Sequence, residues 1–304
     1  MTEPTNDSRN LPAVAFLGLG VMGFPMAGHL ASAGYAVTVY NRTKRKADDW
    51  LSQHQNGNCA IGETPAEAAR DADIVAMCVG NDDDVRSVVF GEQGALGAMK
   101  PGSLLLDHTT ASESLAKILA TACHDQDIAC LDAPVSGGQA GAENGALTIM
   151  VGGSPEEFSR GEPLFEVYGK KHKLMGEHGA GQLTKMVNQI CIAGVLQGLS
   201  EGVHFAQRAG LDVMEVVDVI AQGAAQSWQM ENRASTMTED EFEFGFAVDW
   251  MRKDLGIALA TGRALEAKLP LTALVDQFYA DVQAQGGGRW DTSSLLRRLT
   301  PAKT

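Results

Sequence analysis

A glycine-rich turn between a short apolar run and a helical pattern constrains the fold of this chain more than any other feature. Residues 13–17 (AVAFL) predict a strand, GLGVMG follows at 18–23, and residues 24–34 have the apolar spacing of a helix. In such a unit the first glycine permits the bend, the second lets the backbone approach a pyrophosphate, and the third allows close packing of helix on strand. A sharp turn without a ligand is the alternative. We predict a dinucleotide site at Gly18, Leu19, Gly20, Val21, Met22 and Gly23.

The end of the next predicted strand, 35–40, bears on the choice of nicotinamide cofactor. An acidic residue about 20 positions past the glycines would accept hydrogen bonds from a free ribose 2′-hydroxyl. Asn41 stands there instead, and Arg42, whose guanidinium suits a phosphate, follows it. We therefore predict a preference for NADPH over NADH, with Asn41, Arg42 and Thr43 among the cofactor contacts. An ordinary solvated helix start is the alternative explanation for these basic residues.

Strand and helix patterns alternate as far as residue 176. The further predicted strands lie at 74–79, 104–107, 128–134, 147–153 and 172–176. This alternation predicts a Rossmann-like α/β domain with a mostly parallel sheet, whose ligands lie at the carboxyl ends of strands. Val79 and Thr109 lie at such ends, and we predict that both contact the cofactor. Thr110 could do the same, or it could be the N-cap of the next helix with Glu113 closing a capping box.

A second glycine-rich segment, VSGGQAGAENGA at 135–146, connects the two strands at 128–134 and 147–153. Glycines leave main-chain N–H groups unshielded, and Ser136 adds a hydroxyl. The segment could therefore bind a carboxylate through Ser136, Gly137 and Gly138. A simple hairpin connection is the alternative.

Only helical patterns remain after residue 176, so the C-terminal part is predicted to be all-α and joined to the first domain by a long helix. This helix, 179–208, is apolar on nearly every side. Lys185 interrupts it, and Asn188 and Gln189 follow at i+3 and i+4, which places three polar groups on one face. A lysine near a helix start could instead extend to water. The predicted domain limits are 1–11 for a disordered tail, 12–177 and 178–304.

Composition and charge narrow the possible partners. The net charge is −14 and the basic residues form no long run, so nucleic acid is not an expected partner. No stretch approaches the roughly 18 apolar residues of a membrane helix. The five cysteines form no C-x-x-C pair, which suits a reducing compartment, and we expect a soluble, cytoplasmic protein. The histidines show no metal-binding spacing, so no metal site is expected, although His108 lies beside the two threonines.

Four stretches together resemble the β-hydroxyacid dehydrogenase family. They are GLGVMGFPMAGHL, DAPVSGGQAGAENGALTIMVGG, GAGQLTKMVNQ and KDLGIAL. The resemblance implies a Rossmann-like domain followed by an α-helical substrate and oligomerisation domain, and a homodimer or homotetramer. It implies an enzyme that interconverts 3-hydroxy acids and semialdehydes with NAD or NADP. Carried onto this chain, it makes Lys185 the catalytic lysine and the residues from Ser136 to Gly138 the substrate loop.

The resemblance also gives a place to residues that spacing alone left unassigned. It moves Thr109 toward the nicotinamide and the substrate, and it places Phe246 and Lys253 near the cofactor. Without it, the adjacent charges of Lys253 and Asp254 would be interpreted as a surface pair. Trp228 is a further candidate substrate contact, in a loop region whose geometry sets the substrate side chain.

The choice between Asn188 and Gln189 is left open by the resemblance. The family commonly has asparagine at the position of Gln189, whereas this chain has its asparagine one residue earlier. This Asn-Gln order and the late GGGRWD stretch look similar to tartronate semialdehyde reductase-like members, which favours a small semialdehyde as substrate. Both amides are therefore predicted substrate contacts.

These assignments give a mechanistic hypothesis in which NADPH provides a hydride and Lys185 the proton for a small carboxylate substrate. An apolar helix suits such a lysine, because loss of solvation lowers the pKa of an ammonium. One alternative is a non-catalytic NADP-binding sensor or interaction module. Another is an imine reductase, an architecture that looks similar but usually lacks this lysine.

Overall fold

The computed structural model describes residues 11–54 and 58–299, and these divide into two compact units between Gln182 and Leu183. The predicted tail lies outside the described residues except for Leu11. The division after Gln182 comes five residues later than the sequence-based limit of 177 (182 − 177), because the first turn of the long helix is hydrogen-bonded to the N-terminal unit, as shown below. The functional assignment of each domain stays a prediction.

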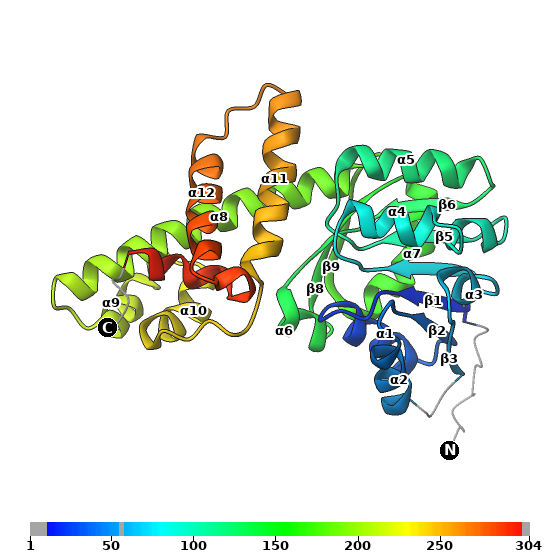
Figure 1. Ribbon diagram of the computed structural model, residues 1–304, viewed down its shortest axis with the longest axis horizontal. Helices are drawn as coiled ribbons and strands as arrows, with labels where there is room; N and C mark the ends of the chain where they lie inside the picture. The colour runs from blue at the N-terminus through cyan, green and yellow to red at the C-terminus, as the bar shows by residue number, and fades with distance from the viewer. Residues whose placement is uncertain (1–10, 55–57, 300–304) are drawn as a thin grey trace, which may run out of the picture. The chain divides into compact units, whose positions relative to one another are not determined.

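The described part of the N-terminal unit contains a nine-stranded sheet in the order β3-β2-β1-β4-β5-β6-β8-β7, with β9 paired to β8 (Figure 1). Strands β1 to β6 are parallel, β8 runs antiparallel to β6 and β7, and β9 is parallel to β8. This confirms the predicted mostly parallel sheet. The strands are β1 (Val14–Leu17), β2 (Val37–Tyr40), β3 (Cys59–Ile61), β4 (Ile74–Met77), β5 (Leu104–Asp107), β6 (Ala129–Asp132), β7 (Val135–Ser136), β8 (Leu147–Gly152) and β9 (Gly169–Gly176).

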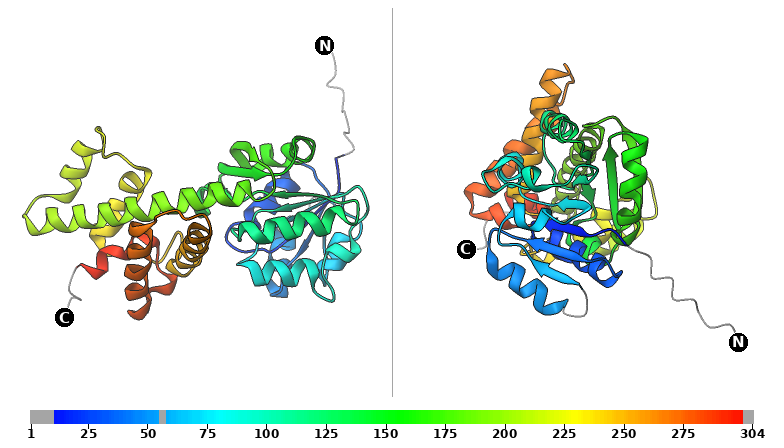
Figure 2. Two further views of the ribbon diagram at one scale, coloured as in Figure 1. Left: turned by 90° about the horizontal axis from the view of Figure 1, so that it is seen from above. Right: turned by 90° about the vertical axis from the view of Figure 1, so that its right-hand side faces the viewer.

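Helices cover both faces of this sheet and create two hydrophobic cores (Figure 2). Side chains alternate along each strand, so Phe16 of β1 enters the core beneath α1, α2 and α7, while its neighbour Leu17 enters the core beneath α3, α4 and α5. Burial on both faces explains the continuous apolar runs of the strand sequences. The helices are α1 (Gly23–Ser32), α2 (Lys44–Gln53), α3 (Pro65–Ala69), α4 (Asp82–Phe90), η1 (Leu96–Ala98), α5 (Glu113–His124), α6 (Gly138–Glu143) and α7 (Pro155–Tyr168).

The helix starts depend on side-chain caps. Helix α7 begins with a complete capping box, in which Ser154 and Glu157 exchange hydrogen bonds with each other's backbone N–H. Helix α5 is capped by Ser112, which accepts from the Leu115 N–H, so the alternative of an N-cap at Thr110 is wrong. Ser112 directly precedes the first residue of the helix, so its hydroxyl and not that of Thr110 accepts the capping hydrogen bond.

The described C-terminal unit is helical, as predicted, and is built around the long helix α8 (Ala180–Arg208). One core joins α8 to α11 and α12, and a second joins it to α9 and α10, so α8 is buried on several sides. No described helix is long and apolar enough to span a membrane. The remaining elements are α9 (Val213–Ile220), α10 (Trp228–Glu239), α11 (Val248–Ala264), α12 (Pro270–Ala284), η2 (Gly287–Arg289) and η3 (Thr292–Arg298).

Candidate active site

The three glycines of the first turn differ in what surrounds them. A side chain at Gly18 would collide with the carbonyl oxygen of Cys78, and one at Gly23 would collide with the carbonyl oxygen of Gly18. Packing therefore explains these two glycines. A Cβ at Gly20 would meet no described atom within 4 Å. The fold itself does not require glycine at this position, which fits a backbone that a ligand approaches closely.

The turn presents an open surface at the N-terminus of α1. Val21 is 57% exposed, and Met22, the N-cap, makes no side-chain capping bond among the described residues. Backbone N–H groups in a helix's first turn have no partner within the helix and attract anions. The arrangement therefore fits the pyrophosphate of a dinucleotide.

Asn41, directly after β2, forms a hydrogen bond with the glycine-rich turn that follows β1. Its Oδ1 accepts a hydrogen bond of 2.8 Å from the Leu19 N–H, and its Nδ2 donates to the Thr43 carbonyl over 3.0 Å. Arg42 is on the surface, and its Nη1 lies 2.9 Å from Asp84 Oδ1, with 84% of the Arg42 side chain exposed. The guanidinium is therefore accessible to a ligand, although such a ligand would compete with the half-buried carboxylate of Asp84.

Thr109 and Val79 are joined at neighbouring strand ends. The Val79 N–H donates to Thr109 Oγ1 over 3.0 Å, and the Thr109 N–H donates to Asp107 Oδ1 over 2.9 Å. Burial raises the pKa of Asp107 to about 7, although the hydrogen bonds from Thr109 oppose the rise. The hydroxyl of Thr109 thus already holds the loop after β4, and its contact with a cofactor stays a prediction.

The start of α8 is held by residues that sequence spacing did not identify. Asp132, at the end of β6, accepts hydrogen bonds from the backbone N–H of Gly179 (2.7 Å) and of Gln182 (2.9 Å). The Gln182 side chain donates to the Thr109 carbonyl over 2.8 Å and accepts from the Ala111 N–H over 3.0 Å. The first turn of the helix that carries Lys185 is therefore locked to the loop that carries Thr109.

The predicted carboxylate-binding segment is partly helical. Ser136 ends β7, opposite Thr148, and Gly137 and Gly138 have φ values of +136° and +62° before α6 begins. The segment connects the antiparallel strands β7 and β8 and contains the short helix α6 (Gly138–Glu143), so it is more than a simple hairpin connection. A Cβ at Gly138 would meet no described atom within 4 Å, so its main chain is unshielded as the nest hypothesis requires.

His108 has a structural role in the fold. It is buried, with Nδ1 2.7 Å from the Ala133 carbonyl oxygen and Nε2 2.9 Å from the Tyr168 hydroxyl. Burial lowers the pKa of His108 to about 4, so the ring is neutral near pH 7. In this neutral ring Nδ1 donates to the Ala133 carbonyl oxygen, and Nε2 accepts from the Tyr168 hydroxyl.

His124, Glu157 and His178 form a cluster whose potential ligand atoms lie within 4.8 Å of one another. His124 Nε2 is 2.8 Å from Glu157 Oε1, and His178 Nε2 is 3.2 Å from Glu157 Oε2. Two histidines and a carboxylate could hold a zinc ion. Each of these atoms already has a hydrogen-bonding partner, so the cluster is satisfied as an ionic contact. Sequence spacing missed it because the residues come from α5, α7 and the segment before α8.

This cluster makes stability depend on pH. Burial alone would raise the pKa of Glu157, but hydrogen bonds from His178 and His124 hold it below its usual range. The hydrogen bond to Glu157 raises the pKa of His178. The His178 contribution is present below its unfolded pKa of about 6.5 and is lost as pH rises through the folded pKa. The Glu157 contribution is present above about 4.3 and is lost as pH falls through its folded value.

We therefore predict that His178→Gln destabilises the protein by about 1 kcal/mol more at pH 5.5 than at pH 8.5. Urea unfolding at both pH values measures the difference. His172→Gln is the matched control, because His172 lies 3.1 Å from Glu162 and no second histidine among the described residues pairs with that carboxylate. An equal loss at both pH values for His178→Gln would contradict the prediction.

In the C-terminal unit, Lys185 is only 6% exposed and lies on the same helix as the two amides. Gln189 Nε2 donates to Asp254 Oδ2 over 2.7 Å, and Asn188 Nδ2 donates to Gln189 Oε1 over 2.7 Å. Lys253 Nζ lies 3.1 Å from Asp254 Oδ1. The interpretation of Lys253 and Asp254 as a surface pair is wrong, because Asp254 is buried among the helices α8 and α11.

Two aromatic candidates have contacts within this unit. Trp228 begins α10 and is half exposed, with the guanidinium carbon of Arg233 4.9 Å from its ring centroid. Phe246 donates its N–H to Asp291 Oδ2 over 3.0 Å. Asp291 is the aspartate of the GGGRWD stretch and also caps η3. That stretch therefore has a structural explanation, and the roles of Trp228 and Phe246 toward ligands stay predictions.

The fold and the glycine turn define a two-domain NAD(P)-binding oxidoreductase. Residues 13–176 match the family model of the NAD-binding domain of 6-phosphogluconate dehydrogenase. Residues 179–299 match the model described as NAD-binding of NADP-dependent 3-hydroxyisobutyrate dehydrogenase. The chain belongs to the β-hydroxyacid dehydrogenase family, which includes the 3-hydroxyisobutyrate dehydrogenases.

Similar proteins cover nearly the whole chain. An "uncharacterized oxidoreductase" of Shewanella frigidimarina is 60% identical over 96% of this chain and 99% of its own length. The 2-hydroxy-3-oxopropionate reductase of Escherichia coli is 37% identical over 94% of this chain and 96% of its own. The solved structure of Mycobacterium tuberculosis 3-hydroxyisobutyrate dehydrogenase with L-serine has a TM-score of 0.85 and 30% identity, and the match covers 96% of this chain and 100% of that one.

Proposed function

We propose that this protein interconverts a small 3-hydroxy acid and its semialdehyde, with NADPH as the preferred cofactor and Lys185 as proton donor and acceptor. The observation that carries the proposal is a buried lysine beside two amides on α8, in a chain of this family. Lysine is almost never fully buried unless it is paired, and buried titratable groups gather at functional sites, which supports a catalytic role for Lys185.

In the proposed mechanism, different residues bind the cofactor, bind the substrate and transfer the proton. The backbone from Gly18 to Gly23 binds the pyrophosphate, and Ser136 with the Gly137 and Gly138 amides binds the substrate carboxylate. Bound NADPH supplies the hydride that adds to the aldehyde carbon. Lys185 gives its proton to the carbonyl oxygen, which becomes the hydroxyl, and takes it back in the oxidation direction. A positioned acid of this kind contributes about 10²- to 10⁴-fold to the rate.

The proposed substrate is a small semialdehyde with a carboxylate. The similarity to 2-hydroxy-3-oxopropionate reductase supports this choice, as does the Asn-Gln order after the lysine, which resembles tartronate semialdehyde reductase-like members. The GGGRWD stretch supports it less than the sequence suggested, because its aspartate holds Phe246 and caps η3. A panel of semialdehydes assayed with NADPH and NADH at 340 nm tests the proposal. Absence of turnover across the panel would instead favour a cofactor-binding sensor.

We predict that Arg42→Ala raises the KM for NADPH about tenfold and leaves the KM for NADH nearly unchanged. In the proposed site the exposed guanidinium pairs with the 2′-phosphate, which NADH lacks, and one charge-assisted contact is worth roughly 1.5 kcal/mol. Steady-state kinetics with both cofactors measure the change. Arg45→Ala, which removes an exposed arginine paired with Asp49 on α2, is the matched control. Equal changes for both cofactors would contradict the role of Arg42.

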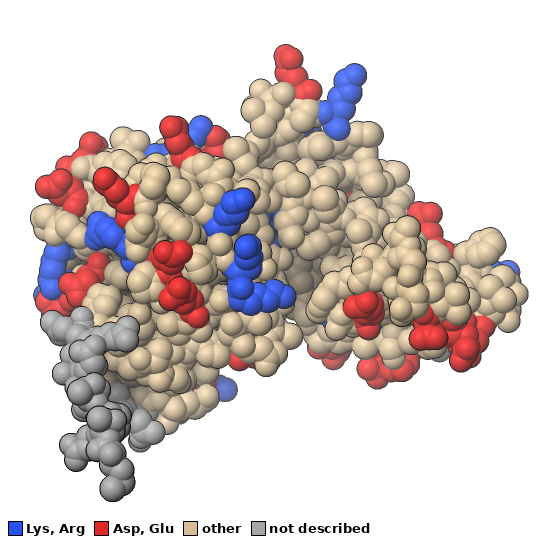
Figure 3. Space-filling view, turned by 180° about the vertical axis from the view of Figure 1, so that it is seen from behind, with Lys and Arg blue, Asp and Glu red and all other residues tan. Residues whose placement is uncertain are grey.

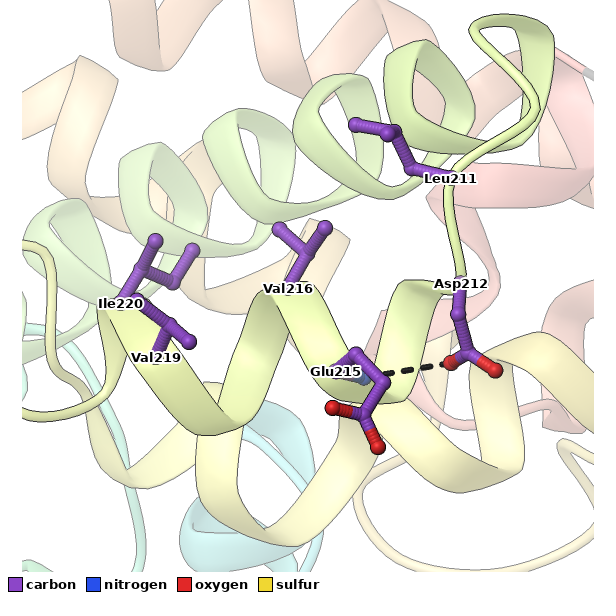
Figure 4. A pocket seen from close by; sticks show the side chains of 6 residues that line it. All are labelled: Leu211, Asp212, Glu215, Val216, Val219 and Ile220. Carbon is purple, nitrogen blue, oxygen red and sulfur yellow. Dashed lines mark hydrogen bonds between the residues drawn. The ribbon is translucent and has the colours of Figure 1, made fainter.

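We also propose a homodimer or homotetramer. Large apolar side chains are exposed on α8 and α9, among them Phe205, Met214 and Val219. An open hollow of about 370 Å³ lies at α9 and the two residues before it. Leu211, Val216, Val219 and Ile220 line it together with the carboxylates of Asp212 and Glu215 (Figure 4). Acidic side chains also gather along the lower edge of this unit in Figure 3, and like charges there oppose self-association. The apolar surface is therefore the proposed contact, and light scattering in solution tests it.

A further inference from the structure

The amides of Asn188 and Gln189 belong to a hydrogen-bonded chain that begins at Asp254. Lys253 pairs with Asp254 Oδ1, Gln189 donates to Asp254 Oδ2 over 2.7 Å, and Asn188 donates to Gln189 Oε1 over 2.7 Å. Gln189 is 1% exposed, and its Nε2 also lies 3.9 Å from Met251 Sδ. Asn188 is only half-buried.

The chemistry of Asp254 fixes the direction of this chain. A carboxylate only accepts hydrogen bonds, so Gln189 must turn its NH₂ group toward Asp254. Its carbonyl oxygen then faces Asn188, and Asn188 must turn its own NH₂ group inward to donate. The orientation of both amides follows from one buried acceptor.

We propose that Gln189 is a positioning residue and that Asn188 is the amide that contacts the substrate. The proposal rests on the proposed function. Gln189 uses its NH₂ group on Asp254 and its oxygen on Asn188, whereas the network uses only one Nδ2–H of Asn188. Asn188 follows Lys185 at i+3, which places the two side chains on neighbouring positions of one helix face.

The fixed orientation also selects a chemical class of substrate. The network uses Nδ2 of Asn188 and not its Oδ1, which is an acceptor and therefore pairs with a hydroxyl and repels a carboxylate. A hydroxyl can also accept from the second Nδ2–H. Asn188 therefore favours a semialdehyde that carries a hydroxyl beside the carbonyl carbon over one that carries a methyl group there.

Two substrates that differ only in this group test the inference, 2-hydroxy-3-oxopropionate and 2-methyl-3-oxopropionate. We expect Asn188→Ala to lower kcat/KM about tenfold for the hydroxylated substrate and less than threefold for the methylated one. Gln189→Met, which keeps the length of the side chain but makes neither hydrogen bond, should have the same selective effect. Neither variant should change the KM for NADPH.

A double-mutant cycle separates positioning from direct contact. If Gln189 acts through Asn188, the double variant loses no more than the larger single loss, because the second change removes nothing further. A loss of about a hundredfold, the product of the two, would show that Gln189 makes its own contact and would overturn the proposal. An unchanged substrate ratio in Asn188→Ala would overturn it too.

Gln197→Met is the matched control, because Gln197 is another amide on α8 whose Nε2 donates to Glu201 over 2.7 Å. It should leave the substrate ratio unchanged. Asp254→Asn retains an oxygen that can accept from Gln189, so it should keep the ratio, whereas Asp254→Leu should lose it. Thermal unfolding shows whether an Asp254 variant is folded. If it is not, the Asn188 and Gln189 variants alone decide the question. A wild-type protein that reduces neither substrate would instead refute the proposed function.

Discussion

Replacing Lys185 by alanine should lower kcat for semialdehyde reduction by about 10²- to 10⁴-fold and leave the Kd of NADPH within about twofold. The loss follows from the removal of the proton donor, while the glycine turn that binds the cofactor belongs to a different unit of the chain. Single-turnover absorbance at 340 nm measures the chemical step, and NADPH fluorescence measures binding. Near-normal turnover in this variant would show that the proton comes from another group.

Lys185→Arg distinguishes proton donation from charge alone. An arginine keeps the positive charge but does not give up its proton, since its pKa lies far above the pH of the assay. If Lys185 acts as an acid, the arginine variant should be nearly as slow as the alanine variant. Recovery of most of the activity by arginine would mean that the cation only stabilises developing negative charge. Lys100→Ala, which removes an exposed lysine near Asp71, is the control and should retain full turnover.

Local sequence patterns predicted most of the fold because each depends on neighbouring residues. The alternation of apolar strands and amphipathic helices up to residue 176 corresponds to the observed sheet and its covering helices. The Ser154 capping box and the start of α12 at Pro270 were readable for the same reason. Burial of side chains on both faces of the sheet left a clear signal, since it requires continuous apolar runs.

The contacts that hold the candidate site could not be predicted in the same way, because they join distant parts of the chain. Asp132 accepts a hydrogen bond from the Gln182 N–H across 50 residues, and Asp254 accepts one from the Gln189 side chain across 65. Nothing in the sequence around any one of these polar residues indicates its distant hydrogen-bonding partner. A buried carboxylate following an apolar strand, as in CLDAP, was the available signal, because such a group requires hydrogen-bond donors.

Replacing Gly20 by alanine should raise the Kd of NADPH by about 10- to 100-fold without lowering the melting temperature. A Cβ at this position has no described atom within 4 Å, so the fold can accept it. A pyrophosphate lying against the backbone cannot, because the methyl group occupies the path of approach. Fluorescence titration with NADPH and thermal unfolding provide the two measurements.

Gly23→Ala is the matched comparison, because it lies in the same turn but glycine is needed there for a different physical reason. A Cβ there would collide with the Gly18 carbonyl oxygen inside the fold, so this variant should lose about 2 kcal/mol or more of stability. The two variants therefore separate a glycine required by a ligand from one required by packing. If Gly20→Ala bound NADPH as tightly as the wild type, the pyrophosphate would not pass over this residue. The assignment of the turn as the cofactor site would then need a different path for the phosphates.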